Sequence, residues 1–311
     1  MHGTHGGSTR VVFLCHRPTP AQLEFYGTFP AAGFDVSVVV DDDAWRIDPP
    51  AGVTAVYVPE DECVAAGYTD FNPAVVKPSH CSAWDKAIYH FSRQHFSRQH
   101  FSRQHFSRQH FSRQHLTQQP AGDDIWLIED DVFLDSAGTL RAIDERYRGI
   151  DIVSAENVLH HDPRDPQWPW IRFVPADVLP GPWTHSMVCA VRLSDPVLGL
   201  VAEFIRTHGA TLARGNGWKR RLHRLAAGLR IPQGFVESIA MPHYPFIEYI
   251  FHTLAVHEGL SVHVADELAT IKWQQQWRPE ELEAGRLYHP VKAIDRHPEF
   301  RRRIEVGGDA V

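Results

Sequence analysis

Residues 123–134 read DDIWLIEDDVFL, an apolar run of strand character that ends in three consecutive carboxylates, Glu129, Asp130 and Asp131. Because burying an unpaired carboxylate is costly, these acids require a partner. In an extended backbone Glu129 and Asp131 point to one side and Asp130 to the other, so the first and third acids can share one ligand. Oxygen ligands in this arrangement suit Mg²⁺ or Mn²⁺. A solvated strand end, or pairing with Lys or Arg, fits the triplet equally well.

The sequence before the triplet indicates a βαβ series. Two short apolar runs end in polar residues, the first in His16-Arg17-Pro18 and the second in Asp41-Asp42-Asp43, and both patterns are typical of buried strands. A helix begins at Ser82, which serves as N-cap with Asp85 at the N3 position. The predicted strands here are residues 11–14, 34–40 and 53–58, and the other predicted helix is residues 20–29.

The sequence after the triplet continues the alternation of helices and strands. An early acid and a first-turn proline favour a helix that begins near Ser194 and runs to Arg206, and Gly259 is a suitable helix end. The predicted helices are residues 139–147, 194–206 and 246–257, and the predicted extended segments are 150–155, 168–174, 187–192 and 260–264.

The pentapeptide HFSRQ occurs five times in tandem at residues 90–114. Five residues advance a helix by about 500°, so successive Phe side chains shift by roughly 140° and form no stripe. In a strand the odd period exchanges faces with each copy. We therefore predict that residues 95–119 are an insertion outside the fold. Histidines spaced by five are not a chelating pair on a helix, which argues against a metal site in the tract.

Composition sets the broad class of the protein. The chain has 311 residues, 43% of them apolar, and a net charge of −7, which argues against a generally basic, nucleic-acid-binding surface. Four widely spaced cysteines without a CxxC pair favour reduced core residues. Without an apolar leader or a long apolar run, we expect a cytoplasmic protein without a transmembrane segment. Residues 1–9 are expected to be a disordered tail and 296–311 a C-terminal tail around a single domain, residues 10–295.

Residues 214–230 interleave Lys and Arg with leucines. This pattern favours a solvated amphipathic helix or a surface insertion over a patch that binds an acceptor or a partner.

The order of these motifs resembles the GT-A glycosyltransferase superfamily. The similarity is greatest to uncharacterised algal and large-DNA-virus members with a WDKA helix before a W-x-I-E-D-D-V-F strand, and the motifs here are SAWDKAIYHF, IWLIEDDVFL and LYHPVK. The resemblance implies an α/β, GT-A-like (Rossmann-like) fold, with a mixed, mostly parallel sheet flanked by helices. Residues 10–135 would be the nucleotide-sugar half and 136–295 the acceptor half.

The resemblance also assigns roles to single residues. The acidic triplet corresponds to the D-x-D motif, which implies Asp131 as the direct metal ligand, Glu129 as a second ligand despite the departure from Asp, and Mn²⁺ or Mg²⁺ as cofactor. The late His289 matches a further metal ligand, although a surface His before a Pro turn fits the same position. The residues implied in nucleotide-sugar binding are Arg17, Asp43, Lys86, Asp130 and Lys292.

A catalytic base is implied in the second half. Glu248, in HYPFIEYIFHTLAVHEGL, matches the acid near the acceptor, with Glu237 as the competing candidate and solvent exposure as the plain alternative. His252, four residues later, is expected to pair with Glu248 if the segment is helical.

Together these features predict a metal-dependent glycosyltransferase that moves a sugar from a nucleotide-diphospho-sugar donor to a glycan, protein or lipid acceptor. The alternatives are a catalytically inactive GT-A-like binding module and, with less support, a metal-dependent phosphohydrolase, which needs more converging carboxylate or His ligands.

Overall fold

We describe the protein from a computed structural model. The described residues are 9–68, 81–100, 124–162, 164, 165, 168, 171, 176–232, 235, 236, 246–273 and 275–308. The N-terminal tail, most of the HFSRQ insertion, most of the extended segment at 168–174, and Glu237 lie outside these ranges.

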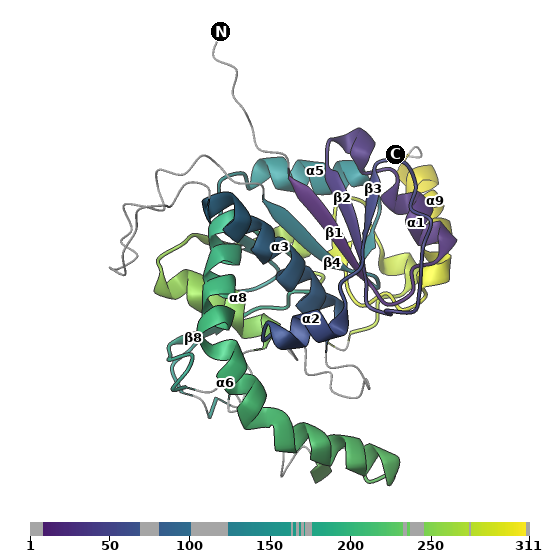
Figure 1. Ribbon diagram of the computed structural model, residues 1–311. Coiled ribbons are helices and arrows are strands. Elements are labelled where there is room, and N and C mark those ends of the chain that lie inside the picture. Colours follow the sequence, from purple (N-terminus) through teal and green to yellow (C-terminus); the bar gives the residue numbers. More distant parts are fainter. Residues whose placement is uncertain are drawn as a thin grey trace.

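A seven-stranded sheet forms the centre of the molecule (Figure 1). Its order is β10-β6-β9-β4-β1-β2-β3, and only β9 runs antiparallel to its neighbours β4 and β6. The mixed, mostly parallel sheet flanked by helices is therefore as predicted, and it is compatible with a Rossmann-like fold. The strands are β1 (Arg10–Cys15), β2 (Asp35–Val40), β3 (Val53–Val56), β4 (Ile125–Glu129), β6 (Ile152–Ser154), β9 (Ala190–Leu193) and β10 (Val262–Val264).

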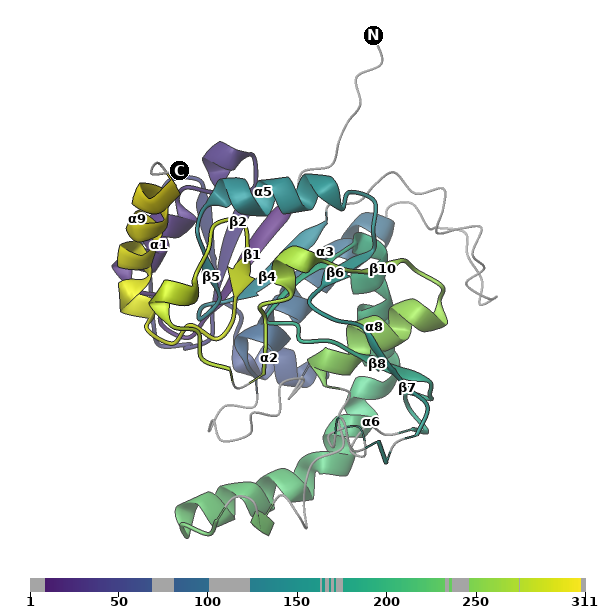
Figure 2. The same ribbon diagram turned by 180° about the vertical axis from the view of Figure 1, so that it is seen from behind.

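Helices cover both faces of this sheet (Figure 2). Val12 and Leu14 of β1 face one core with α3, α6 and α8, whereas Val11 and Phe13 face the other with α1 and α5. The near-continuous burial of β1 follows from this two-sided packing. The helices are α1 (Pro20–Tyr26), α2 (Glu60–Ala65), α3 (Ala83–His100), α5 (Ala137–Arg146), α6 (Asp195–Gly228), α8 (Ile247–His257) and α9 (His297–Gly308), with short 3₁₀ turns at Pro30–Ala32, Asp266–Leu268, Pro279–Glu281 and Ile294–Arg296.

The predicted start of α3 is confirmed by its hydrogen bonds. The Ser82 backbone N–H donates to Asp85 Oδ2 at 2.6 Å, and the Asp85 N–H donates to Ser82 Oγ at 3.4 Å, which is a capping box. The helix continues to His100, so the first residues of the predicted insertion extend α3.

One prediction of irregular structure was wrong. The end of the chain, expected to be a tail, forms α9, because Phe300 is buried against Phe133 and His297 is buried beside it. For the basic segment the helical alternative is confirmed, since α6 extends from Asp195 through Gly228. The sequence analysis also missed α2 and two small sheets, one of β5 (Phe133–Leu134) with β11 (Leu287–Tyr288) and one of β7 (Val158–His160) with β8 (Trp183–His185).

The helix α6 passes the end of α2 at a contact between two glycines. A Cβ atom on Gly209 would lie 2.9 Å from the Gly67 carbonyl oxygen, and Gly67 itself has φ +85°. We expect Gly209→Ala to lower the free energy of unfolding by about 1–3 kcal/mol, because backbone cannot yield as a flexible side chain can.

Gly228, in the last turn of the same helix, is the matched control for this prediction. A Cβ there meets nothing within 4 Å, so Gly228→Ala should leave stability unchanged or raise it by up to about 1 kcal/mol. Urea denaturation of both variants checks the pair. Equal stability of the two would mean that the helices do not approach this closely.

Candidate metal centre

The acidic triplet lies at the carboxyl edge of the sheet, where the strand order reverses. From β1 the chain adds β2 and β3 on one side and then β4 on the other, so the reversal falls between β1 and β4. Open α/β sheets bind ligands outside the carboxyl ends of strands at such a point. Glu129 ends β4 there, and Arg17 follows the end of β1.

The pairing of β11 with β5 brings the late histidine to the triplet. Tyr288 pairs with Phe133 in an antiparallel register, and the Val291 N–H donates to the Asp131 carbonyl oxygen at 2.9 Å. His289 Nε2 then lies 3.6 Å from Glu129 Oε2 and 3.4 Å from Asp131 Oδ1. The structure thus brings together the three residues predicted as metal ligands.

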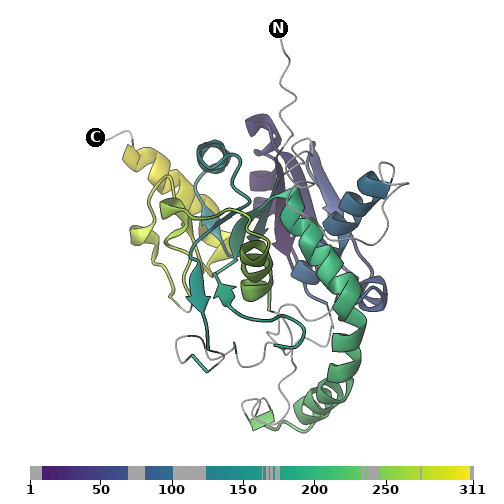
Figure 3. The same ribbon diagram turned by 90° about the vertical axis from the view of Figure 1, so that its left-hand side faces the viewer.

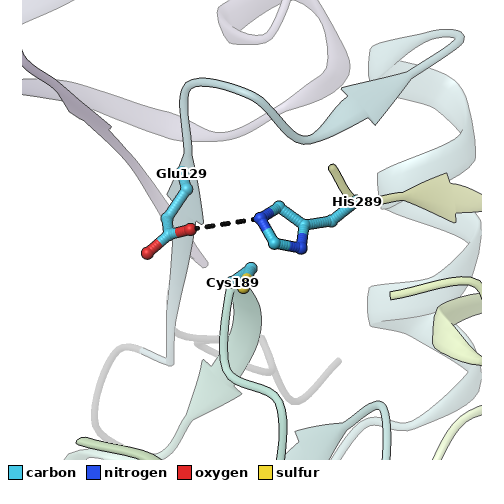
Figure 4. Close-up of side chains that lie close together, drawn as sticks. All are labelled: Glu129, Cys189 and His289. Carbon is cyan, nitrogen blue, oxygen red and sulfur yellow. Dashed lines mark ion pairs between the residues drawn. The ribbon is translucent and has the colours of Figure 1, made fainter. Parts of the chain in front are cut away.

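Cys189 is a fourth group at this point, and the sequence analysis did not assign it there. One ligand atom from each of Glu129, Cys189 and His289 lies within 4.8 Å of the others (Figure 4). Cys189 precedes β9, and its carbonyl oxygen accepts the Glu129 N–H at 2.8 Å, so strand pairing places it beside the acid. All four cysteines are buried and unbridged, as predicted, and only the non-local pairing of β9 shows which one faces the site.

His289 and Lys292 neutralise Asp131. Burial by itself raises the pKa of Asp131, but the hydrogen bonds and positive charges of His289 and Lys292 lower it to about 2. Burial lowers the pKa of His289, whereas its hydrogen bond to Asp131 and the charges of the acids produce a net rise. Ion pairing is thus the charge compensation that the triplet required.

Asp130 and Asp131 lie in the turn that follows β4, where the extended backbone assumed for the triplet has ended. Burial, followed by the charges of Asp131 and Glu129, raises the pKa of Asp130 to about 6. Asp130 lines a pocket of about 430 Å³ with Lys292, the two arginines Arg17 and Arg296, and the side chains or backbone of Thr19, Gln22, Ala293, Ile294 and Asp295. Three residues predicted to bind the nucleotide sugar therefore share one pocket.

The remaining two of these residues, Asp43 and Lys86, form a separate pair. Lys86 is 1% exposed, and its Nζ donates to the Asp41 carbonyl oxygen at 2.6 Å and to Asp43 Oδ1 at 2.5 Å. Asp43 Oδ2 also accepts the Glu60 N–H at 3.2 Å. This buried ammonium holds the loop after β2 in place, whereas the prediction had expected it to reach toward a sugar or phosphate.

Glu248 lies in the first turn of α8, and its carboxylate is buried. Its Oε2 atom has no hydrogen-bond partner among the described residues. Burial, together with the charge of Glu129, raises the pKa of Glu248 to about 7 against a lowering contribution from a backbone hydrogen bond. The charges of Glu129, Asp131 and Glu248 also contribute, after burial, to the raised pKa of Cys189. Glu248 is therefore electrostatically coupled to the candidate metal centre.

The expected pairing of His252 with Glu248 was wrong. His252 is fully buried, and its Nε2 lies 2.8 Å from Ser154 Oγ at the end of β6. Both residues are in α8, as the helical spacing predicted, but the His252 side chain packs toward β6 and does not pair with Glu248.

A chain of titratable side chains that the sequence analysis missed runs beside α8. His160 Nδ1 lies 2.8 Å from Asp165 Oδ2, and its Nε2 lies 2.6 Å from His185 Nδ1. His185 Nε2 lies 3.7 Å from Glu156 Oε1, and Trp168 stacks on the His185 ring at 4.4 Å. Burial, with the charge of His160, lowers the pKa of His185 to about 4. The pairing of β7 with β8 brings these side chains together, so no local sequence motif predicts the arrangement.

Comparison with known proteins identifies no matching family and no significant match to a curated protein. Within the part of the chain that the structure describes, no helix combines the length and apolar character that a membrane crossing needs.

Proposed function

We propose that this protein is a metal-dependent glycosyltransferase of the GT-A kind, which transfers a sugar from a nucleotide-diphospho-sugar. The observation that carries the proposal is the convergence of Glu129, Asp131 and His289 at the reversal of strand order, next to the pocket that contains Arg17 and Lys292. Acidic ligands beside a basic pocket suit a metal-bound diphosphate.

The three ligands fit a small divalent cation. Octahedral Mg²⁺ has ligands at about 2.1 Å, so adjacent ligand atoms are roughly 3 Å apart. The separations of 3.4 and 3.6 Å from His289 Nε2 to the two carboxylates require only a small contraction. The imidazole of His289 suits Mn²⁺ better than Mg²⁺, which prefers oxygen ligands throughout, whereas ligation by a Cys189 thiolate would favour a softer metal such as Zn²⁺. A bound cation would neutralise the charge that develops on the diphosphate leaving group.

Lys292 and the arginines of the pocket support binding of the donor. Lys292 Nζ is paired with Asp131 Oδ2 in this state. A cation on Asp131 would compete for that carboxylate, and the Lys292 ammonium would then be available to a phosphate oxygen in the pocket that it lines. Arg17, which lines the pocket, is 56% exposed at its side chain, pairs with Asp42 and lies over the Trp45 ring at 5.4 Å.

Glu248 supports the acceptor step. In an inverting reaction its carboxylate takes the proton of the acceptor hydroxyl, the hydroxyl oxygen bonds to the anomeric carbon, and the bond from that carbon to the diphosphate breaks. A pKa of about 7 makes the carboxylate basic enough for this role near neutral pH.

The test of the proposed function is a donor screen. The purified protein is incubated with UDP-, GDP- and CMP-sugars with Mn²⁺ or with EDTA, and melting temperature and nucleotide release are measured. We expect stabilisation and slow nucleotide release for one donor class with Mn²⁺ only. Metal-dependent nucleotide binding without release would favour the inactive binding module, and hydrolysis of simple phosphate esters would favour the phosphohydrolase.

The pH profile of turnover tests the role of Glu248. Because its pKa is raised to about 7, the base is charged above that value and protonated below it. We expect kcat to fall about tenfold for each pH unit below 7 and to level off above 7. The variant Glu248→Gln should lose this inflection, and a wild-type profile that is flat between pH 5 and 8 would exclude Glu248 as the base.

A further inference from the structure

The C-terminal part of α6 carries a row of exposed apolar side chains. Trp218, Leu222, Leu225 and Leu229 are 57%, 37%, 64% and 65% exposed. At about 100° per residue, their spacing of four, three and four places them within an arc of roughly 60°. They therefore form one continuous stripe along the helix, hereafter the α6 stripe.

The apolar surface continues beyond the end of the helix. The Leu229 N–H donates to the Leu225 carbonyl oxygen at 3.0 Å, so the last stripe residue keeps the helical position. Arg230 then adopts φ 55°, and the Ile231 N–H closes the turn on the Ala226 carbonyl oxygen at 3.0 Å. Ile231 and Phe235, which follow, are 40% and 61% exposed.

The same segment concentrates positive charge. Between Glu203 and Glu237 the sequence contains seven Lys or Arg residues and no Asp or Glu, although the whole chain has a net charge of −7. Lys219 and Arg221 lie on opposite borders of the stripe by helical position. The stripe is thus an apolar centre with basic edges.

The position of α6 leaves this surface accessible. The C-terminal half of the helix extends away from the sheet in all three views (Figures 1, 2 and 3). An exposed apolar patch of this kind usually marks an interaction surface, since soluble proteins rarely leave one unused.

We propose that the α6 stripe docks on an anionic lipid surface. Apolar side chains with Trp at one end and basic residues on the flanks are the pattern of a helix that lies in a membrane interface, with the cations among the headgroups. A nucleic acid would use the cations but not the leucines. A second copy of this helix would bring like charges together. Only the lipid surface uses both components of the stripe.

The experiment is co-sedimentation of the full chain with two kinds of sucrose-loaded vesicle. One contains phosphatidylcholine alone, and in the other about one lipid in three is the anionic phosphatidylserine. We expect binding to the anionic vesicles to be at least about tenfold tighter and to weaken in high salt. Leu225→Ser with Leu229→Ser should reduce binding about tenfold or more, since two apolar insertions are lost.

Two controls make the experiment decisive. Leu159→Ser with Val306→Ser removes two apolar side chains that are 48% and 73% exposed elsewhere, and it should bind vesicles as the wild type does. Melting curves must show that both double variants fold. Equal binding to both vesicle types, or an unchanged affinity of the stripe variant, would overturn the proposal. Two other results would also overturn it. One is a wild-type protein that binds single-stranded RNA but not vesicles, with RNA binding unchanged in the stripe variant. The other is a wild-type dimer that becomes monomeric in the stripe variant.

Discussion

Asp131→Asn is expected to abolish metal-dependent nucleotide stabilisation and to lower turnover by about 100-fold or more. The substitution removes the negative charge of a proposed metal ligand. That charge is strongly stabilised by His289 and Lys292, which lower the pKa of Asp131 to about 2. The amide keeps the size of the carboxylate, so the effect reports charge and ligation. Melting curves with Mn²⁺ and nucleotide, together with nucleotide release, measure it.

Asp162→Asn is the matched control. Asp162 is an exposed acid that pairs with Arg164, away from the candidate metal centre. It should behave as the wild type in both assays. If Asp131→Asn bound nucleotide and metal as the wild type does, the proposed site would be wrong, whatever the activity of the protein.

Arg192→Met is expected to produce the largest loss of stability among single substitutions in the sheet. Arg192 in β9 is 1% exposed, and it forms ion pairs with Asp144 at 2.9 Å and with Asp124. It also donates to the carbonyl oxygens of Tyr147 and Ile150 at 3.1 and 3.0 Å. Its removal leaves the buried Asp144 without a cation and the two carbonyls without a donor.

Breaking such a buried pair costs about 3–5 kcal/mol, which corresponds to a fall in melting temperature of roughly 10 °C. Thermal unfolding and urea denaturation measure it. Arg164→Met, at a side chain that is 87% exposed, is the control and should change stability by less than about 0.5 kcal/mol. Replacing both partners, with Arg192→Met and Asp144→Leu, should recover part of the loss. A loss at Arg192 no greater than at Arg164 would contradict the buried ion-pair network.

Local patterns predicted most of the sheet and the helices that cover it. The apolar runs of β1 and β2 and the capping box at Ser82 act within a few residues, so they are visible without the fold. The helix α9 was missed because tertiary contacts decide it, such as the burial of Phe300 against Phe133. The GT-A assignment itself stays a prediction.

The residues of the candidate site were predictable where strand alternation or the family resemblance applied to them. Glu129 and Asp131 share one side as predicted, although the chain turns after Glu129 instead of continuing as a strand, and the resemblance pointed to His289, which lies beside them. Cys189 was interpreted correctly as a buried, reduced residue, but it lies just before β9, and its partner depends on the non-local pairing of β9 with β4. For Lys86, the sequence gives no indication that the ammonium is buried against Asp43.

The short ladder between β5 and β11 has a consequence for how the protein matures. Each strand contributes only two residues, yet this pairing, with the bond from the Val291 N–H to Asp131 and the bridge between Ile271 and His289, carries His289 and Lys292 across to an acidic triplet that is synthesised far earlier. During translation, the central sheet has all its strands by Val264, whereas the proposed metal ligands are complete only once His289 has been added. A nascent chain that stops between these two points would thus have every strand of the central sheet but not the proposed cation site, so metal uptake would report that β11 has been made.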